Sequence, residues 1–167
     1  MPNRKSKIDI FSMINVADIE ASDLEHKKEV AASLNEAENY LMGFDWCLKI
    51  IDGWIAASYG YILNIFCFNI KPDGKSCNDD FVWVIVGDIP PAYIDVYSAS
   101  TQYDALKAYI NIMQDWVDNV IEGNSLELCF PVNVPPERKY AEMLDIRLKL
   151  LKEDYLPEIY KEYPQTQ

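Results

Sequence analysis

The chain has 167 residues, of which 50% are apolar and 13% aromatic, and its formal net charge is -12. This length and apolar content are enough to bury one core, which excludes a disordered acidic tail. The charge excludes nucleic acid and an anionic membrane as main partners, because both are bound through basic surfaces. We expect one domain over 21–160, an irregular lead-in over 1–20, and a frayed C-terminus over 161–167.

The cysteines and the histidine exclude several common kinds of site. Cys47, Cys67, Cys77 and Cys129 form no CxxC pair, and the chain shows no secretory signal or membrane-spanning apolar run. We therefore expect free thiols in a cytoplasmic protein. The single histidine, His26, cannot supply a zinc pair and is expected to be solvated. The six glycines are too dispersed for a phosphate-binding loop, so we predict neither metal nor cofactor.

The first periodic segment covers residues 22–42 and has apolar residues at helical spacing. It predicts a helix that Ser22 or Asp23 caps at its start and that Gly43 ends. The residues before it, 8–20, predict only a short irregular or helical lead-in.

Residues 45–88 are rich in aromatic and β-branched residues and predict an antiparallel meander of strands. The expected strands are Trp46–Ile51, Trp54–Tyr59, Tyr61–Ile70 and Phe81–Val86. Asp52-Gly53 is a hairpin signal, whereas Gly60 indicates a bend or bulge within a longer strand, and Pro72-Asp73-Gly74 begins a turn. The last two strands are almost continuously apolar, so we expect helices to cover both faces of the sheet.

Two prolines follow the sheet segment and predict a loop over Gly87–Tyr97, because they prevent a helix or a central strand. Thr101 and Asp104 form a capping box at the start of a long amphipathic helix that Gly123 ends. Leu126–Val134 is expected to be an edge strand or an extended segment.

A last helix begins after Pro135-Pro136, and Pro157 is expected to stop it. The predicted fold class is therefore α+β. We expect an antiparallel meander sheet of three to five strands packed by about three main helices, in the order α-β-β-β-β-α-(β)-α.

Three blocks carry a resemblance to a known family. They are FVWVIVGDIPPAYI at 81–94, the helix containing Met113, Trp116 and Val117, and PVNVPP at 131–136. Over about residues 44–151 the chain resembles an uncharacterised family of small bacterial proteins, a domain of unknown function. The resemblance implies a single bacterial domain and assigns no catalytic residues.

Most of the negative charge is concentrated between Ser76 and Glu137. This segment contains ten acidic residues and one basic residue, Lys107, a net of -9, which leaves -3 for the other residues. Such a segment either only maintains solubility or forms an acidic face that steers a cationic protein partner. Tyr93, Tyr97, Tyr103 and Trp116 add possible aromatic anchors. The candidate partner-binding residues are Asp88, Tyr93, Asp95, Tyr97, Tyr103, Asp104, Asp115, Asp118 and Glu122.

Catalytic and calcium-binding interpretations of the acids are less well supported. Asp80 and Asp88 flank one strand and would be roughly 25 Å apart, too far for paired carboxylate catalysis. Asp88 could pair instead with Asp52 or Asp95, although a turn residue is the simpler interpretation. The loop 73–80 lacks the glycine and glutamate positions of an EF-hand.

The leading hypothesis is a non-enzymatic acidic protein-binding module. Its concrete form is a bacterial immunity or inhibitor-type protein that occludes a basic site on a partner toxin or enzyme. The alternative is a small enzyme or ligand-binding protein with a carboxylate-lined pocket near the Gly87–Tyr97 loop.

Overall fold

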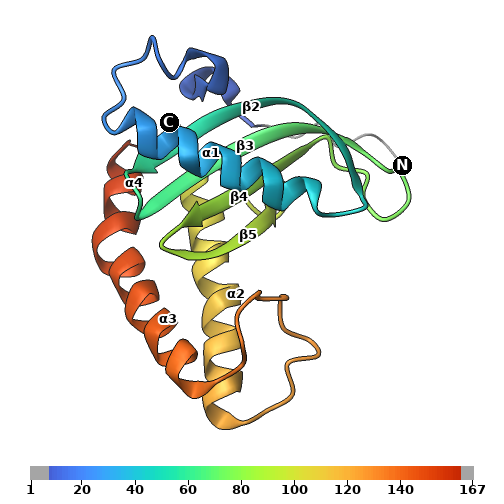
Figure 1. The fold of residues 1–167 in the computed structure, drawn as a ribbon, viewed down its shortest axis with the longest axis vertical. Coiled ribbons are helices and arrows are strands. Elements are labelled where there is room, and N and C mark those ends of the chain that lie inside the picture. Colours follow the sequence, from blue (N-terminus) through green and yellow to red (C-terminus); the bar gives the residue numbers. More distant parts are fainter. Residues whose placement is uncertain (1–7, 163–167) are drawn as a thin grey trace.

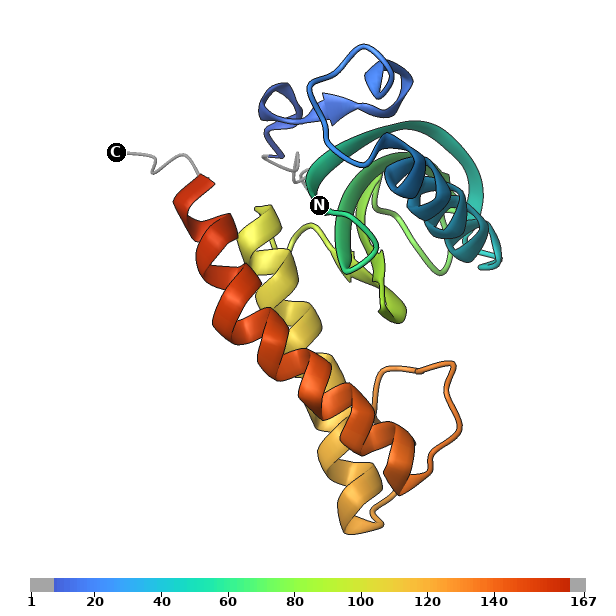
Figure 2. The same ribbon diagram turned by 60° about the vertical axis from the view of Figure 1, so that its left-hand side comes forward.

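The computed structural model describes residues 8–162. Helix α1 (Lys27–Met42) covers one face of an antiparallel sheet, and α2 (Gln102–Glu122) crosses the other (Figures 1 and 2). Helix α3 (Arg138–Leu150) packs along α2 and continues through a π-helical turn, Leu151–Tyr155, into α4 (Leu156–Glu162). The predicted α+β fold, with a meander sheet and three main helices, is confirmed. The basic residues Arg4, Lys5 and Lys7, and residues 163–167 of the expected C-terminal tail, lie outside the described part.

Within the described residues, the sheet has five strands in the order β1-β2-β3-β4-β5, and all neighbouring strands are antiparallel. The strands are β1 (Ile14–Asn15), β2 (Cys47–Tyr59), β3 (Leu63–Pro72), β4 (Phe81–Gly87) and β5 (Ile89–Asp95). Side chains of β3 and β4 alternate between two buried cores. Ile65 and Trp83 belong to the core with α2, whereas Phe66 and Val84 belong to the core with α1. Helices cover both faces of these strands, as predicted.

The predicted turn at Asp52-Gly53 is wrong, because both residues lie inside β2. The predicted bend within a strand at Gly60 is also wrong, because the chain reverses there between β2 and β3, with a Gly60 φ of 62°. A Cβ atom on Gly53 would lie 2.8 Å from the ring of Phe68 on β3. The Asp52 carboxylate accepts hydrogen bonds from the Asn15 side chain at 3.0 Å and the Gly53 N–H at 2.8 Å. The Asp52-Gly53 pair is therefore not a turn. Gly53 lets the Phe68 ring pack closely, and the Asp52 carboxylate links β2 to β1 through Asn15.

The predicted loop at Gly87–Tyr97 is also wrong over most of its length, because residues 89–95 form the edge strand β5. An edge strand accommodates one of Pro90 and Pro91, since every second N–H points outward and needs no partner. The other lies where the β4–β5 register is irregular, between the Ile85–Ala92 and Gly87–Ile89 pairs. Gly87 has a φ of 152°, and a Cβ atom there would collide with the Ile62 carbonyl. The tight β4–β5 hairpin therefore requires glycine at this position.

Leu126–Val134 forms no strand and consists of turns and irregular backbone. The segment packs onto the edge of the sheet instead. The ring of Phe130 lies 5.3 Å from that of Tyr93 on β5. The two edge strands of the sheet are β1 and β5. Strand β1 lies in the segment for which the sequence predicted only an irregular lead-in.

Helix α1 begins at Lys27, five residues after the predicted start. The Ser22 hydroxyl donates to the Ile19 carbonyl at 2.5 Å and accepts from the Leu24 N–H at 3.3 Å, which makes a turn before the helix. His26 is exposed and directly precedes the helix, with a φ of 58°. Ile19 is buried against the α1 core.

The predicted boundaries of α2 are confirmed. The Thr101 hydroxyl accepts a hydrogen bond from the Asp104 N–H at 3.1 Å, and Gly123 ends the helix with a φ of 72°. The predicted stop at Pro157 is wrong, because the helix continues to Glu162. The wider π-helical turn lies directly before Pro157, where a regular turn would bring the proline ring against a carbonyl of the preceding turn.

All four cysteines are free thiols, as predicted. Cys47 and Cys67 are buried, and burial raises the pKa of the Cys67 thiol to about 12. Within residues 8–162, none of the helices has the length and apolar character to cross a membrane.

Candidate functional site

Three of the predicted acids lie on one face of α2, near its C-terminal end. Asp115, Asp118 and Glu122 are spaced three and four residues apart, which places them side by side on a helix, and all three are exposed. This end of α2 projects past the edge of the sheet (Figures 1 and 2). We call these three residues the acidic face of α2.

Hydrogen bonds order the acidic face and extend it to a second helix. The Gln114 amide donates to the carboxylates of Asp118 at 2.9 Å and Asp145 on α3 at 3.0 Å. The Asn119 amide donates to the carbonyl and carboxylate of Asp115, at 2.8 and 3.2 Å. The amide nitrogens therefore hold carboxylates in place without neutralising their charge.

The charge arrangement of the acidic face is unfavourable for the isolated helix. The C-terminus of a helix carries partial negative charge, and acids spaced by three or four residues repel one another. The last turn of α2 contains no basic residue that would offset this repulsion. A cationic partner placed against the face would relieve it.

An exposed apolar side chain accompanies the acids. Leu128 is 98% exposed and lies in the segment after α2. Its neighbour Cys129 places it beside the acidic face, because the Cys129 Sγ lies 3.5 Å from the Asn119 amide nitrogen. Desolvation, followed by the Asp115 carboxylate, raises the pKa of the Cys129 thiol.

The remaining predicted acids lie elsewhere. Asp104 is at the opposite end of α2, in its first turn. Asp95 lies at the end of β5 beside Asp79, whose carboxyl pKa is raised by burial and then by the charges of Asp95 and Asp80. Asp88 lies in the hairpin between β4 and β5. The acidic segment therefore divides among separate parts of the molecule and does not form a single face.

The predicted aromatic anchors also have different surroundings. Tyr93 packs against Phe44, Trp46 and Phe130, with ring centroids 5.0 to 5.3 Å apart. The ring of Tyr103 packs against that of Tyr160, and Tyr97 is 45% exposed. Trp116 is buried, at 3% exposure. Trp116 is thus a core residue and not an anchor for a partner.

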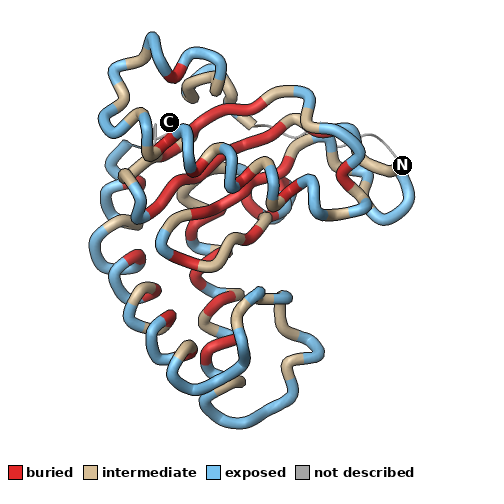
Figure 3. Tube along the Cα trace, viewed as in Figure 1, coloured by how far each residue is buried: buried red, intermediate tan, exposed pale blue. Residues whose placement is uncertain are grey.

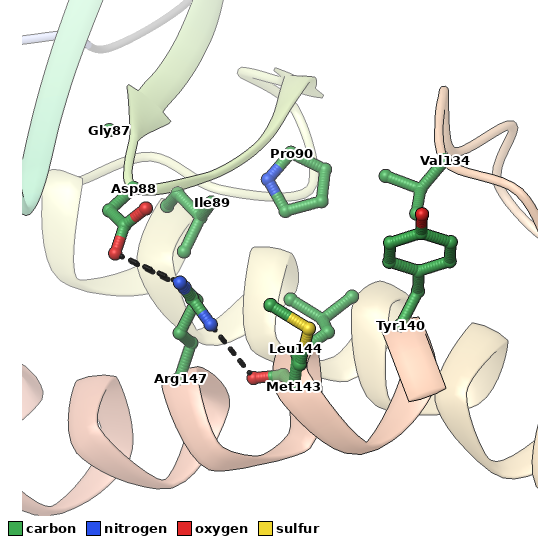
Figure 4. Close-up of a pocket in the computed structure, with 9 residues that line it drawn as sticks. All are labelled: Gly87, Asp88, Ile89, Pro90, Val134, Tyr140, Met143, Leu144 and Arg147. Carbon is green, nitrogen blue, oxygen red and sulfur yellow. Dashed lines mark hydrogen bonds and ion pairs between the residues drawn. The ribbon is translucent and has the colours of Figure 1, made fainter. Parts of the chain in front are cut away.

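A pocket of about 330 Å³ lies between the β4–β5 hairpin and α3 (Figure 4). Its lining residues are Gly87, Asp88, Ile89, Pro90, Val134, Tyr140, Met143, Leu144 and Arg147. The Arg147 guanidinium binds the Asp88 carboxylate at one end, with Nε and Nη2 both 3.2 Å from the same oxygen. Val134 and Tyr140 lie at the other end. The lining holds this one carboxylate, already paired, so it offers no second acid for acid–base chemistry.

The described residues include no group of three or more His, Cys, Asp or Glu side chains that could hold a metal ion. No protein-family model matches this chain, and neither a curated protein nor a solved structure matches it. The resemblance of the 81–94 and 131–136 blocks to an uncharacterised bacterial family therefore stays a prediction.

Sequence reasoning missed Asp145, Leu128 and Arg147. Asp145 joins the acidic face only because α3 packs along α2, and Arg147 meets Asp88 from 59 residues away. No local pattern encodes such contacts. Leu128 lies in the largely apolar stretch 126–132, so no local pattern distinguishes its exposed side chain from its partly buried neighbours.

Proposed function

We propose that this protein is a non-enzymatic protein-binding module, which engages a partner with a basic surface through the acidic face of α2. The observation that carries the proposal is the row of exposed acids Asp115, Asp118 and Glu122 on one face of α2, which ends in the C-terminal turn, where acids are least favoured. An arrangement that opposes the stability of the isolated fold is explained when the charges act on a second molecule.

The neighbouring side chains support the same proposal. Exposed carboxylates accelerate the encounter with a cationic surface, but they add little affinity once solvated. Leu128, at 98% exposure, supplies apolar area that a partner can bury. An apolar side chain bordered by charged residues matches the apolar centre and polar rim of specific interfaces.

In its concrete form, the proposal is an immunity or inhibitor-type protein of the bacterial cytoplasm. A toxin or enzyme that acts on phosphate-bearing substrates needs a basic active site, and an acidic helix end can occlude such a site. No cofactor or metal takes part in this function.

The test is capture of a partner from the source cell at low and high salt, followed by binding measurements with the purified partner. Reversal of Asp115, Asp118 and Glu122 to lysine is expected to slow association at least ten-fold at low salt. The matched control reverses Asp18, Glu20 and Glu25, which are exposed acids of the N-terminal region. Equal effects of the two triple variants would contradict the proposal, because net charge alone would then explain binding.

A ligand-binding function is the second candidate, and the pocket beside Gly87 favours it. The pocket is mainly apolar, with the Asp88–Arg147 pair at one end, which suits a small apolar molecule carrying one polar group. A thermal-shift screen of such compounds tests this function, with Val134→Trp as the variant that fills the pocket. Stabilisation that persists in Val134→Trp would place the ligand elsewhere.

A further inference from the structure

The outer side of α3 exposes a row of apolar side chains. Met143, Ile146 and Leu150 are 48%, 69% and 39% exposed, although large apolar residues of a helix are normally turned toward the core. Their spacing of three and four residues places them in one row, which is the spacing that packs against another helix. Met143 borders this row and also lines the pocket on the adjoining side of the helix (Figure 4). The opposite side of α3, with Ala141, Leu144 and Leu148, already packs on the core.

Charged residues extend this row at both ends. Lys139 lies four residues before Met143, and Asp154 lies four residues after Leu150, and both are exposed. Along this side of the helix, a cationic residue is therefore followed by three apolar residues and then by an anionic residue. We call Lys139, Met143, Ile146 and Leu150, together with Asp154 of the π-helical turn that follows α3, the outer row of α3. Figure 3 shows this side of the helix as exposed, and in Figure 2 α3 lies in front of α2.

We propose that the outer row of α3 is the contact surface for a second copy of this chain, with the two α3 helices packed antiparallel about a two-fold axis at Ile146. In that register Ile146 meets Ile146, and Met143 of each copy meets Leu150 of the other. Lys139 of each copy then meets Asp154 of the other. The row is self-complementary in this direction, as a two-fold interface requires.

The charges also favour this occupant over a parallel helix or an unrelated acidic partner. A parallel second copy would place Lys139 against Lys139 and Asp154 against Asp154, and like charges at an interface are repulsive. An acidic partner would be attracted by Lys139 but repelled by Asp154. Lys139 lies 3.4 Å from Glu137 within its own chain, but both side chains are more than half exposed, and such surface pairs contribute little.

The π-helical turn after α3 affects where Asp154 lies relative to the apolar residues of the row. It spans Leu151–Tyr155 and ends the regular part of α3 just after Leu150. One added residue in a helical turn rotates the residues that follow it back around the axis. This rotation brings Asp154 closer to the line of Met143 and Leu150. A single helix pair is smaller than a standard interface, which buries about 800 Å² per partner, so we expect a weak dimer.

Sedimentation velocity of the full chain over a concentration series tests this proposal. The weight-average mass is expected to rise from the 19.3 kDa of the monomer toward twice that value. Ile146→Asp places two like charges at the axis and is expected to keep the chain monomeric at all concentrations. Phe11→Asp, which changes a side chain 95% exposed in another part of the molecule, is the control and should leave the dimer intact.

A charge swap tests the antiparallel register itself. Lys139→Glu and Asp154→Lys each convert two attractive pairs into repulsive ones, so each is expected to weaken the dimer about ten-fold. The double variant restores both pairs and is expected to recover the original dissociation constant. Circular dichroism confirms that each variant is folded. A chain that stays monomeric throughout, a dimer unaffected by Ile146→Asp, or a double variant weaker than both single variants overturns the proposal.

Discussion

The hydroxyl of Tyr109, in the middle of α2, donates a hydrogen bond to the carbonyl of Pro90 at 2.6 Å. Tyr109 is fully buried, and Pro90 lies near the start of the edge strand β5. The bond therefore ties the long helix to the strand that carries two prolines. It also fixes the strand side of the pocket that Pro90 lines.

Replacement of Tyr109 by phenylalanine is expected to lower the free energy of unfolding by about 1–3 kcal/mol. The substitution keeps the ring but removes the donor to the part-buried Pro90 carbonyl, and a partly desolvated carbonyl that loses its hydrogen bond is costly. Urea denaturation with unchanged m-value measures the loss. A loss below about 0.5 kcal/mol would mean that water replaces the hydroxyl.

Tyr59→Phe is the same chemical change at a site with the opposite environment. The Tyr59 hydroxyl is buried and has no hydrogen-bond partner within residues 8–162. Its ring packs against Tyr155 with centroids 5.0 Å apart, and phenylalanine retains that contact. Removal of an unsatisfied hydroxyl is expected to raise the free energy of unfolding by about 1 kcal/mol. A decrease comparable to that of Tyr109→Phe would show that the hydroxyl is bonded in solution.

Gly53→Ala tests the correction at Asp52-Gly53. The new methyl group would lie 2.8 Å from the Phe68 ring, and overpacking of this kind lowers stability by about 1–3 kcal/mol. If Phe68 is the cause, the same substitution should be less harmful in a Phe68→Leu background, which a double-mutant cycle measures. An additive cycle would assign the loss to the backbone instead.

The sequence predicted the elements whose signals are local, and it failed where a distant residue decides. The Thr101 cap, the Gly123 end and the covered strands β3 and β4 all follow from neighbouring residues. Asp52-Gly53 and Pro157 carry turn and stop signals that tertiary structure overrides, through Phe68 packing and a π-helical turn. The acidic face was partly predictable, because Asp115, Asp118 and Glu122 share helical spacing.

Reversal of Asp118 and Glu122 to lysine is expected to stabilise the chain by about 0.5–1 kcal/mol, since cations favour a helix C-terminus. Glu29 lies in the first turn of α1, and Glu29→Lys should instead lower stability. Thermal unfolding at low ionic strength measures both effects, and added salt should reduce them. If the Asp118 and Glu122 reversal destabilised the chain, the acids would have a structural role that the proposed binding function does not require.

The carboxyl of Asp79 gives stability a pH dependence. Burial raises its pKa, and the charges of Asp95 and Asp80 raise it further. A carboxyl with a higher pKa in the folded state opposes folding when it is ionised, so the penalty is complete above the folded pKa. This penalty decreases as the pH falls through the folded-state pKa toward the ordinary Asp pKa of about 3.9. Asp79→Asn is therefore expected to raise stability near neutral pH by up to about 0.5 kcal/mol.

The gain from Asp79→Asn should shrink as the pH is lowered, and it should be smallest below about pH 3.9, where the native carboxyl is protonated in both states. Urea denaturation of both proteins between neutral and acidic pH measures this difference. Asp18→Asn, at an exposed carboxylate of the N-terminal region, controls for the loss of one negative charge. A gain that is constant over the whole pH range would mean that the amide forms a new contact, and that repulsion among Asp79, Asp80 and Asp95 is not its source.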